Sequence, residues 1–240
     1  MKAIILAAGI GSRLRPLTNN IPKCLVEVNN KSIIEYQIDA YLEAKVEEII
    51  IITGYLSKHL VEFIQKKYKS ENIKFIENKN YNDTNNMYSL YLAKDYLLDK
   101  NFILSNADVV FDKNMVKDLI SYNDNTSLIS VDKGNFLDES MKIIVKDETI
   151  TSISKQIKKS DAYGVSIDLY KFNKSDSNIL FEEIKKIIEV EKNLNSWTEV
   201  ALNNILNKTN FKPFDIENKF WYEIDNHEDL KIAKDIVKRG

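Results

Sequence analysis

MKAIILAAGIGSRLRPLT, residues 1–18, joins an apolar run to a loop that is rich in glycine and arginine. Residues 1–8 have the largely apolar character of a buried parallel strand, and the residues that follow lack helical periodicity. Gly9 and Gly11, two of the six glycines in the chain, let a backbone approach a ligand closely. Three cations stand in or near this loop: Arg13, Arg15 and Lys23. We therefore expect the loop to bind phosphate and the chain to bind a nucleotide.

Two commoner phosphate-binding motifs are absent from the sequence. A dinucleotide fingerprint requires a third glycine where Leu14 stands, and Pro16 discourages an immediate long helix. The glycine spacing and Gly-Lys-Ser/Thr ending of a P-loop do not occur anywhere in the 240 residues. A glycine pair after a strand can also mark a simple tight turn, but the neighbouring cations favour phosphate binding.

Length and charge limit the possible functions. The 240 residues can form one large α/β domain or a domain with an inserted lobe. Lys+Arg (34) and Asp+Glu (36) nearly balance, and the net charge of −2 argues against nucleic-acid binding. The first apolar run is too short for a signal peptide or membrane span, and no later run approaches ~18 residues. We expect a cytoplasmic protein without membrane insertion, in which the single Cys24 is not a catalytic thiol.

Strand and helix patterns alternate along the chain, which favours an α/β fold with a mostly parallel sheet covered by helices. Ser32 and Glu35 have capping-box spacing, and four consecutive isoleucines at 49–52 are typical of a central strand. From Leu128 onward the pattern becomes more β-like. Strands are expected over 1–8, 47–53, 73–77, 101–105, 141–145, 150–154, 163–172, 211–216 and 221–224. Helices are expected from Ser32 to about Ala44 and over 57–68, 85–98, 177–191, 198–207 and 226–238.

Longer motifs give the chain a resemblance to a known family. LAAGIGSRLRPLT (6–18), followed by PKCL (22–25), resembles the signature of the sugar-phosphate nucleotidyltransferase superfamily. Four later segments resemble its phosphocholine cytidylyltransferase-like branch: NNMYSLYLA (85–93), ADVVFD (107–112), ISK (153–155) and FWYEID (220–225). The resemblance covers nearly the whole chain and is weakest over 131–192. It implies a Rossmann-like, mostly parallel mixed sheet flanked by helices, of the GT-A-like nucleotidyltransferase type, in a single domain over residues 1–240.

The resemblance also implies a reaction, the transfer of CMP from CTP to a small phosphomonoester with release of pyrophosphate. A phosphomonoester with a second pKa near ~6 needs no strong base, so the enzyme can rely on positioning and charge neutralisation. Mg²⁺ usually takes one or two protein carboxylates, and the resemblance assigns this role to Asp108 and Asp225. Simpler roles are open to both: Asp108 can end a strand in a turn, and Asp225 can stabilise the helix that begins at Asn226.

The expected catalytic residues are two cations and the two carboxylates: Arg13, Lys23, Asp108 and Asp225. A guanidinium can donate two parallel hydrogen bonds, so Arg13 is expected on the β- and γ-phosphates. Lys23 matches the Pro-Lys motif of the family and is expected to contact the α-phosphate and the attacking phosphate. A solvated surface position is the alternative for this lysine.

The base is expected over the backbone of the first loop, with amide and hydroxyl side chains at its polar edge and ribose. The expected nucleotide-binding residues are Leu6, Ala7, Ala8, Gly9, Gly11, Ser12, Arg13, Asn85, Asn86 and Ser89. TNNMYS (84–89) replaces the glutamine- and glycine-rich segment of many sugar-nucleotide enzymes, which favours CTP over dTTP or UTP. Asn85 or Asn86 can alternatively cap the helix that follows.

The acceptor site is expected in the second half of the chain, so that residues 1–127 bind the nucleotide and 128–240 bind the acceptor. Lys155 resembles the family lysine that meets the acceptor phosphate, and aromatic and acidic side chains suit the cationic head of phosphocholine. The expected acceptor-binding residues are Lys155, Tyr88, Trp197 and Glu199. Phosphoglutamine and 2-aminoethylphosphonate are alternative acceptors for CTP, and a sugar 1-phosphate is the alternative that would use UTP or dTTP.

The remaining expectations concern the protein as a whole. A nucleotide-sensing subunit without turnover is the alternative of another class, and the presence of the four catalytic residues argues against it. The expected cofactor is Mg²⁺, and the expected partners are CTP and the acceptor, with no nucleic acid. A monomer or homodimer that serves cell-surface polysaccharide or lipid decoration is the expected context.

Overall fold

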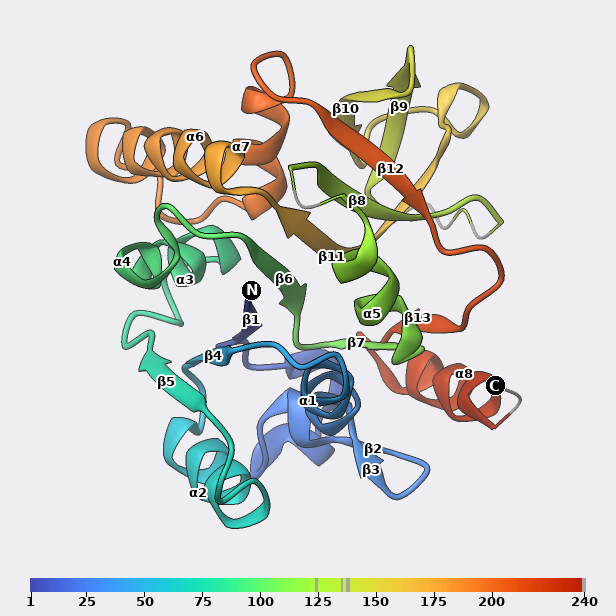
Figure 1. Cartoon of the computed structure of the whole chain (residues 1–240). Helices are drawn as coiled ribbons and strands as arrows, with labels where there is room; N and C mark the ends of the chain where they lie inside the picture. The colour runs from blue at the N-terminus through green and yellow to red at the C-terminus, as the bar shows by residue number, and fades with distance from the viewer. Residues whose placement is uncertain (124, 135, 137–138, 239–240) are drawn as a thin grey trace.

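One mixed sheet organises the molecule (Figure 1). The computed structural model describes residues 1–123, 125–134, 136 and 139–238. Within these residues nine strands form the sheet: β1 (Lys2–Ala7), β4 (Glu48–Thr53), β5 (Ile73–Glu77), β6 (Phe102–Asn106), β8 (Ser127–Asp132), β9 (Lys142–Lys146), β10 (Thr149–Ser154), β11 (Gly164–Phe172) and β12 (Phe211–Asp215). Their order is β10-β9-β11-β6-β1-β4-β5, and β8 pairs with both β11 and β12. The expected mixed sheet flanked by helices is confirmed.

The register of the parallel strands sets the place of the first loop. β1 lies between β4 and β6, with Ile4 opposite Ile50 on one side and Leu104 on the other. Parallel strands end at one edge of the sheet, so the residues after β1 and after β6 meet there. The loop that begins at Ala8 and the turn that contains Asp108 are therefore neighbours.

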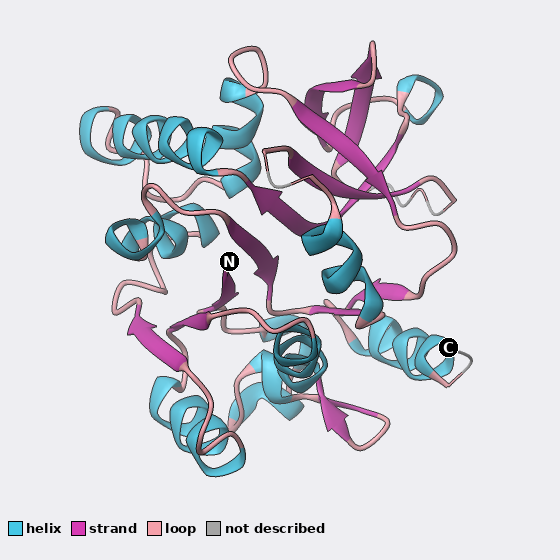
Figure 2. Ribbon diagram, viewed as in Figure 1, coloured by secondary structure: helices cyan, strands magenta, loops and turns pink. Residues whose placement is uncertain are grey.

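Helices cover both faces of the sheet (Figure 2). They are α1 (Ile33–Glu43), α2 (Ser57–Lys67), α3 (Asn86–Leu92), α4 (Lys94–Leu97), α5 (Asn114–Ser121), α6 (Lys174–Lys185), α7 (Thr198–Ile205) and α8 (His227–Val237). Side chains of β1 alternate between two cores: Ile4 packs on the side of α3, α6 and α7, and Ile5 on the side of α1, α2 and α5. Each fully buried isoleucine contributes roughly 1.5–3 kcal/mol, so this alternation fixes the register of the strand.

Two short antiparallel pairs lie outside the main sheet. β2 (Glu27–Val28) pairs with β3 (Lys31–Ser32), and β7 (Val109–Phe111) pairs with β13 (Trp221–Glu223). Directly beside the second pair, the N–H of Ile224 donates to the carbonyl of Asp108 over 2.9 Å. This contact joins the two chain segments that carry the expected metal ligands.

Most expected elements are present, and several differ from the expectation. The helix expected over 85–98 is broken after Leu92. There the chain makes a tighter turn, in which the N–H of Ala93 donates to the carbonyl of Leu90 over 3.0 Å. α6 begins earlier than expected because the Asn173 side chain caps it at Asp176, and it continues into a π-helical turn over Lys186–Val190. α5, β8 and the short strands β2, β3 and β7 were not expected from the sequence. The capping box of Ser32 and Glu35 is confirmed.

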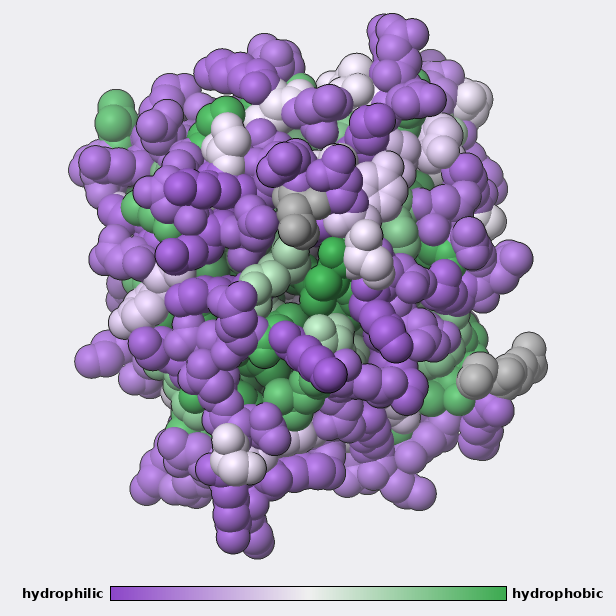
Figure 3. All heavy atoms as spheres, viewed as in Figure 1, coloured by the Kyte–Doolittle hydropathy of each residue, from purple (hydrophilic) through white to green (hydrophobic). Residues whose placement is uncertain are grey.

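The surface is mostly hydrophilic in the view of Figure 3, and apolar side chains group near the middle of this face. Among the described residues, every helix is too short or too polar to cross a membrane. Cys24 is buried, and burial raises the pKa of its thiol to about 12, which keeps it protonated. The thiol therefore lacks the ionised form that a nucleophilic role would require.

Candidate active site

A cavity of about 410 Å³ opens where β1 and β6 end. All ten expected nucleotide-binding residues line it, and so do Lys23, Asp108, Lys155, Trp197, Glu199 and Asp225. Tyr88 is the exception among the expected residues. It stands outside the lining, its hydroxyl accepts from Asn80 over 3.3 Å, and its ring packs against the core under α3.

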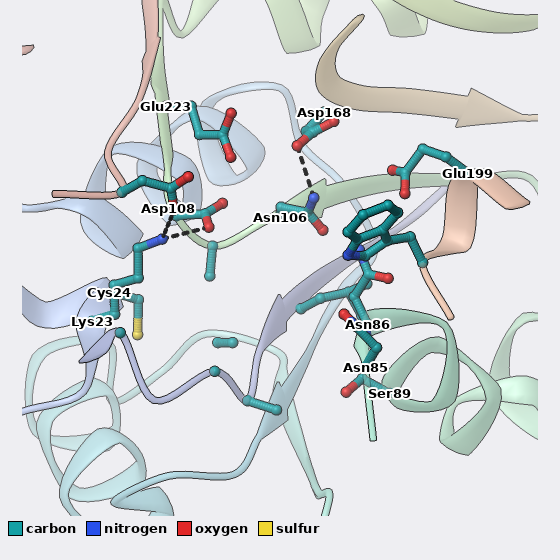
Figure 4. A pocket seen from close by; sticks show the side chains of 18 of the residues that line it. Lys23, Cys24, Asn85, Asn86, Ser89, Asn106, Asp108, Asp168, Glu199 and Glu223 are labelled. Atoms are coloured by element: carbon teal, nitrogen blue, oxygen red, sulfur yellow. Dashed lines mark hydrogen bonds and ion pairs between the residues drawn. The ribbon is translucent and has the colours of Figure 1, made fainter. Parts of the chain in front are cut away.

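Lys23 stands at the centre of an ion-pair cluster (Figure 4). Its Nζ lies 2.7 Å from Oδ2 of Asp108 and 2.7 Å from Oδ1 of Asp225. Arg13 Nη2 lies 2.9 Å from the second oxygen of Asp225. We call Arg13, Lys23, Asp108, Asp225 and the neighbouring Glu223 the charged cluster.

Opposite charges in the cluster shift the pKa of Lys23 and of Asp225. Burial lowers the pKa of Lys23, but the charges of Asp108 and Asp225 and their hydrogen bonds raise it further, so the net pKa lies above its ordinary value. Burial also raises the pKa of Asp225, but Lys23 and Arg13 overcome this effect and hold it below its usual range. At neutral pH the cluster therefore contains a charged ammonium and an ionised Asp225.

Glu223 is a third carboxylate that the sequence analysis missed. It precedes Asp225 by two positions at the end of β13, and side chains two apart in an extended segment share a face. That spacing is the signal in the sequence from which it could have been found. Enclosure in the cavity, followed by the negative charges of Asp168 and Asp108, raises the pKa of Glu223 to about 9.

The donors of the charged cluster fit a hard divalent cation. One carboxylate oxygen from each of Asp108, Glu223 and Asp225 lies within 4.8 Å of the other two. Asp108 Oδ1 is buried and makes no hydrogen bond among the described residues, which leaves an anionic oxygen in need of a partner. Carboxylate oxygens of this kind are the ligands that Mg²⁺ prefers. These three residues could hold the metal.

The two glycines of the first loop have different roles. Gly11 has a φ of +67°, and a Cβ placed there would lie 2.7 Å from Cβ of Lys23. Gly11 is therefore required both by the backbone and by the close passage of Lys23. A Cβ on Gly9 would meet nothing within 4 Å, so the space beside Gly9 is left open toward the cavity.

The amide side chains at the start of α3 are shared between capping and the cavity. Asn85 caps the helix, because its Oδ1 accepts from the N–H of Asn86 over 2.8 Å. Asn86 Oδ1 accepts from the N–H of Thr198, the first residue of α7, over 2.9 Å. Among the described residues Asn86 Nδ2 makes no hydrogen bond, so it is free to donate to a ligand. Ser89 is buried, and its Oγ accepts from Asn78 over 3.1 Å.

A second acidic group lies on the other side of Asn106 (Figure 4). Tyr170 Oη lies 2.9 Å from Oδ1 of Asp168 and 2.9 Å from Oε1 of Glu199. Asn106, the last residue of β6, donates to the other oxygen of Asp168 over 2.9 Å. We call Asp168 and Glu199 the acid pair.

Asp168 was also missed by the sequence analysis. It interrupts an apolar strand between Ile167 and Leu169, and a charged residue at such a position is a signal that could have identified it. The backbone there adopts φ +58° beside a register shift in β11, an arrangement rare for a residue other than glycine. Burial, followed by the charges of Glu199 and Asp108, raises the pKa of Asp168 to about 7. Burial likewise raises the pKa of Glu199.

Lys155 and Trp197 stand at the rim near the acid pair. Lys155 Nζ lies 4.8 Å from the centre of the Trp197 ring and 3.6 Å from Oε2 of Glu139. The charge of Lys155 also acts on Glu199, whose pKa it lowers against the larger effect of burial. The structure thus brings together three of the four expected acceptor residues and leaves Tyr88 apart.

Comparison with known proteins identifies the family of the chain. The nucleotidyl transferase family model matches residues 2–239. Choline-phosphate cytidylyltransferase of Streptococcus pneumoniae is 34% identical, with 99% of each chain covered. CTP:phosphoglutamine cytidylyltransferase of Campylobacter jejuni is 33% identical and covers 97% of this chain and 98% of its own. A solved structure of CTP:phosphocholine cytidylyltransferase from Streptococcus pneumoniae superposes with a TM-score of 0.82 at 31% identity, covering 98% of both chains. The chain belongs to the nucleotidyl transferase family.

Proposed function

We propose that this chain is a Mg²⁺-dependent cytidylyltransferase, which transfers CMP from CTP to a small phosphorylated acceptor and releases pyrophosphate. The observation that carries the proposal is the charged cluster beside the first loop. Two cations and three carboxylates meet there, within the cavity that the expected nucleotide-binding residues line. Two relatives of matching length that are named as cytidylyltransferases support the choice of reaction.

The nucleotide is assigned to the part of the cavity formed by the first half of the chain. The open space beside Gly9 admits a ligand against the backbone that follows β1. The free Nδ2 of Asn86 can donate to the polar edge of a base, where cytosine and uracil differ in hydrogen-bonding polarity. Residues 1–127 are the proposed nucleotide-binding half, and 128–240 the acceptor-binding half.

The reaction needs a nucleophile, charge neutralisation and a leaving group in line. An oxygen of the dianionic acceptor phosphate attacks the α-phosphorus of CTP, and a new P–O bond forms. The bond from the α-phosphorus to its bridging oxygen breaks, and pyrophosphate takes the electron pair. No proton has to be removed from the acceptor, so the side chains act by position and charge.

Lys23 and Arg13 provide two fixed cations for this transfer. Lys23 is proposed to neutralise the α-phosphate and the attacking oxygen, and Arg13 to hold the outer phosphates with its guanidinium. Asp108, Glu223 and Asp225 would hold Mg²⁺, which supplies additional positive charge at the phosphates when bound.

Pyrophosphate release tests the proposal. The purified chain is incubated with each of CTP, UTP, dTTP and ATP, with several phosphorylated acceptors, with Mg²⁺ or with a chelator. We expect acceptor-dependent release with CTP and Mg²⁺ only. Preferential turnover of UTP or dTTP with a sugar 1-phosphate would replace cytidylyl transfer by the sugar-nucleotide reaction. Nucleotide binding without release under every condition would favour the nucleotide-sensing alternative.

A further inference from the structure

At the end of the cavity formed by the acid pair, hydrogen-bond acceptors outnumber the described N–H and O–H groups that could donate to them. Ser166 Oγ donates to Tyr170 Oη over 3.0 Å, and the same phenol lies 2.9 Å from each member of the acid pair. A phenol has one proton and can donate to only one carboxylate at a time. The other carboxylate therefore faces the phenol oxygen without a hydrogen between them, unless it retains a proton of its own.

The described neighbouring side chains do not provide enough hydrogen-bond donors for all the oxygens of the acid pair. Asn106 donates to Asp168, and the described side chains place no ammonium or guanidinium within hydrogen-bond distance of either carboxylate. Glu199 is 5% exposed, so water cannot solvate it freely. Buried carboxylates that lack a cation are costly, and a ligand that brings N–H donors relieves this cost.

We infer that the acceptor is a phosphate or phosphonate monoester that bears a primary ammonium group, and that the acid pair selects it. This inference rests on the proposed function, because it places the acceptor in the same cavity as the charged cluster. A primary ammonium carries three N–H donors, which can be shared between the carboxylate oxygens of Asp168 and Glu199, both of which line the cavity. The phosphate at the other end of the molecule then lies toward Lys23 and the charged cluster.

A trimethylammonium head matches this end of the cavity poorly. It has no N–H to donate, and it is recognised best by the open faces of several aromatic rings. Each described aromatic side chain of the lining already has a partner, at a ring face, through an edge contact or at the indole N–H. The Trp197 ring has Lys155 over its face, the Tyr81 ring packs edge-on against Tyr55, and the Trp221 indole donates to Asp132 over 2.7 Å.

Backbone geometry holds the acid pair in place. The positive φ of Asp168 and the register shift between Ser166 and Tyr170 turn this one side chain out of the regular alternation of β11. Glu199 lies in the first turn of α7, whose first N–H is held by Asn86. The two carboxylates thus come from elements that the core orients independently.

Three acceptors that differ only at the head group test the inference: phosphoethanolamine, phosphocholine and 2-hydroxyethyl phosphate. With CTP and Mg²⁺ we expect kcat/KM for phosphoethanolamine to exceed that for each of the others by roughly 100-fold, because buried acceptors left unpaired discriminate strongly. An equal or higher value for phosphocholine or for 2-hydroxyethyl phosphate would overturn the inference and leave cytidylyl transfer standing. Turnover confined to a sugar 1-phosphate would do the same. Release of pyrophosphate with no acceptor at all would overturn both proposals.

Matched variants locate the selection. Asp168→Asn and Glu199→Gln should each raise KM for phosphoethanolamine by roughly 10-fold or more while KM for CTP changes less than about 2-fold. Glu182→Gln, an exposed carboxylate on α6, makes the same charge change and should alter neither constant. Circular dichroism establishes that each variant is folded. If a variant does not fold, the comparison of the three acceptors on the unaltered chain still tests the inference. Unchanged phosphoethanolamine KM in both folded variants would remove the acid pair from recognition.

Discussion

The charged cluster takes its side chains from loops and short 3-10 turns at the edge of the sheet and from the end of β13, whereas the acid pair lies on a long strand and a helix, β11 and α7. Lys23, Asp108 and Asp225 neutralise one another within the protein. The acid pair has only neutral hydrogen-bonding groups in direct contact. The difference indicates that ligand binding at the charged cluster must replace ion pairs within the protein. Ligand binding at the acid pair instead brings a cation to carboxylates that have none in contact among the described residues.

The largest effect is expected from Lys23→Met, which keeps the aliphatic stem and removes the charge. Loss of a cation that stabilises the transferring phosphate should lower kcat roughly 10³-fold. The KM for CTP should rise much less, and steady-state kinetics separate the two constants. Lys158→Met, at an exposed position, is the matched control and should leave both unchanged. Equal losses in CTP binding and turnover would make Lys23 a ground-state anchor.

Asp108→Asn should reduce turnover by roughly 100-fold or more, because it removes a charged metal ligand and preserves size. Isothermal titration with Mg²⁺ in the absence of nucleotide gives a second readout, in which affinity should fall. Asp112→Asn makes the same substitution at a carboxylate that accepts from the N–H of Asn114, and turnover should remain within about 2-fold. Near-normal kcat of the Asp108 variant at saturating Mg²⁺ would contradict the assignment.

Asn86→Ala connects the two sites. From sequence, Asn86 belongs to the nucleotide half alone, and only the CTP to UTP preference should change. The hydrogen bond from Thr198 to Asn86 adds a second effect, because α7 carries Glu199. We expect the CTP to UTP ratio to fall and the acceptor KM to rise, each by roughly 5- to 10-fold, as for one lost buried hydrogen bond. If the acceptor KM stays constant, Asn86 does not couple the nucleotide site to the acceptor site.

The two glycines of the first loop give a matched pair. Gly11→Ala forces a Cβ against Lys23 at a positive φ and should lower the free energy of unfolding by about 1–2 kcal/mol. Gly9→Ala meets no neighbouring atom, so stability should be unchanged while the KM for CTP rises. Denaturant unfolding and kinetics measure the two effects. A destabilised Gly9 variant with normal CTP binding would show that the space beside Gly9 is needed for the stability of the fold and not for the nucleotide.

The smallest expected effect is on the pH dependence of stability. Asp168 has a pKa of about 7 in the folded chain, well above its ordinary value near ~3.9, so the folded state retains a proton that the unfolded state releases. Its contribution to stability therefore decreases as the pH rises from about 4 to about 7 and is constant above that. Asp168→Asn removes this titration. The difference in Tm, variant minus parent, should become more positive between about pH 5 and about pH 8, and a difference independent of pH would contradict the shift.

Local patterns in the sequence were sufficient for the parts of the molecule made from contiguous residues. The apolar run of β1, the first loop and the capping box at Ser32 each depend on residues only a few positions apart. Steric, propensity and capping effects act over that distance, so their outcome can be read without knowledge of the fold. The motifs also identified Lys23, Asp108 and Asp225 as members of one site.

Tertiary packing was needed for the contacts between distant segments. Tyr170 meets Glu199, Asn86 meets Thr198, and Tyr88 turns toward Asn80 and away from the cavity. The first two contacts join a strand or a helix start to α7, and their formation depends on how the helices pack against the sheet. That packing is set by the whole buried apolar surface, a sum over many residues that no local spacing contains. Glu199 was expected at the acceptor site from the sequence, but its pairing with Asp168 through Tyr170 is visible only in the folded chain.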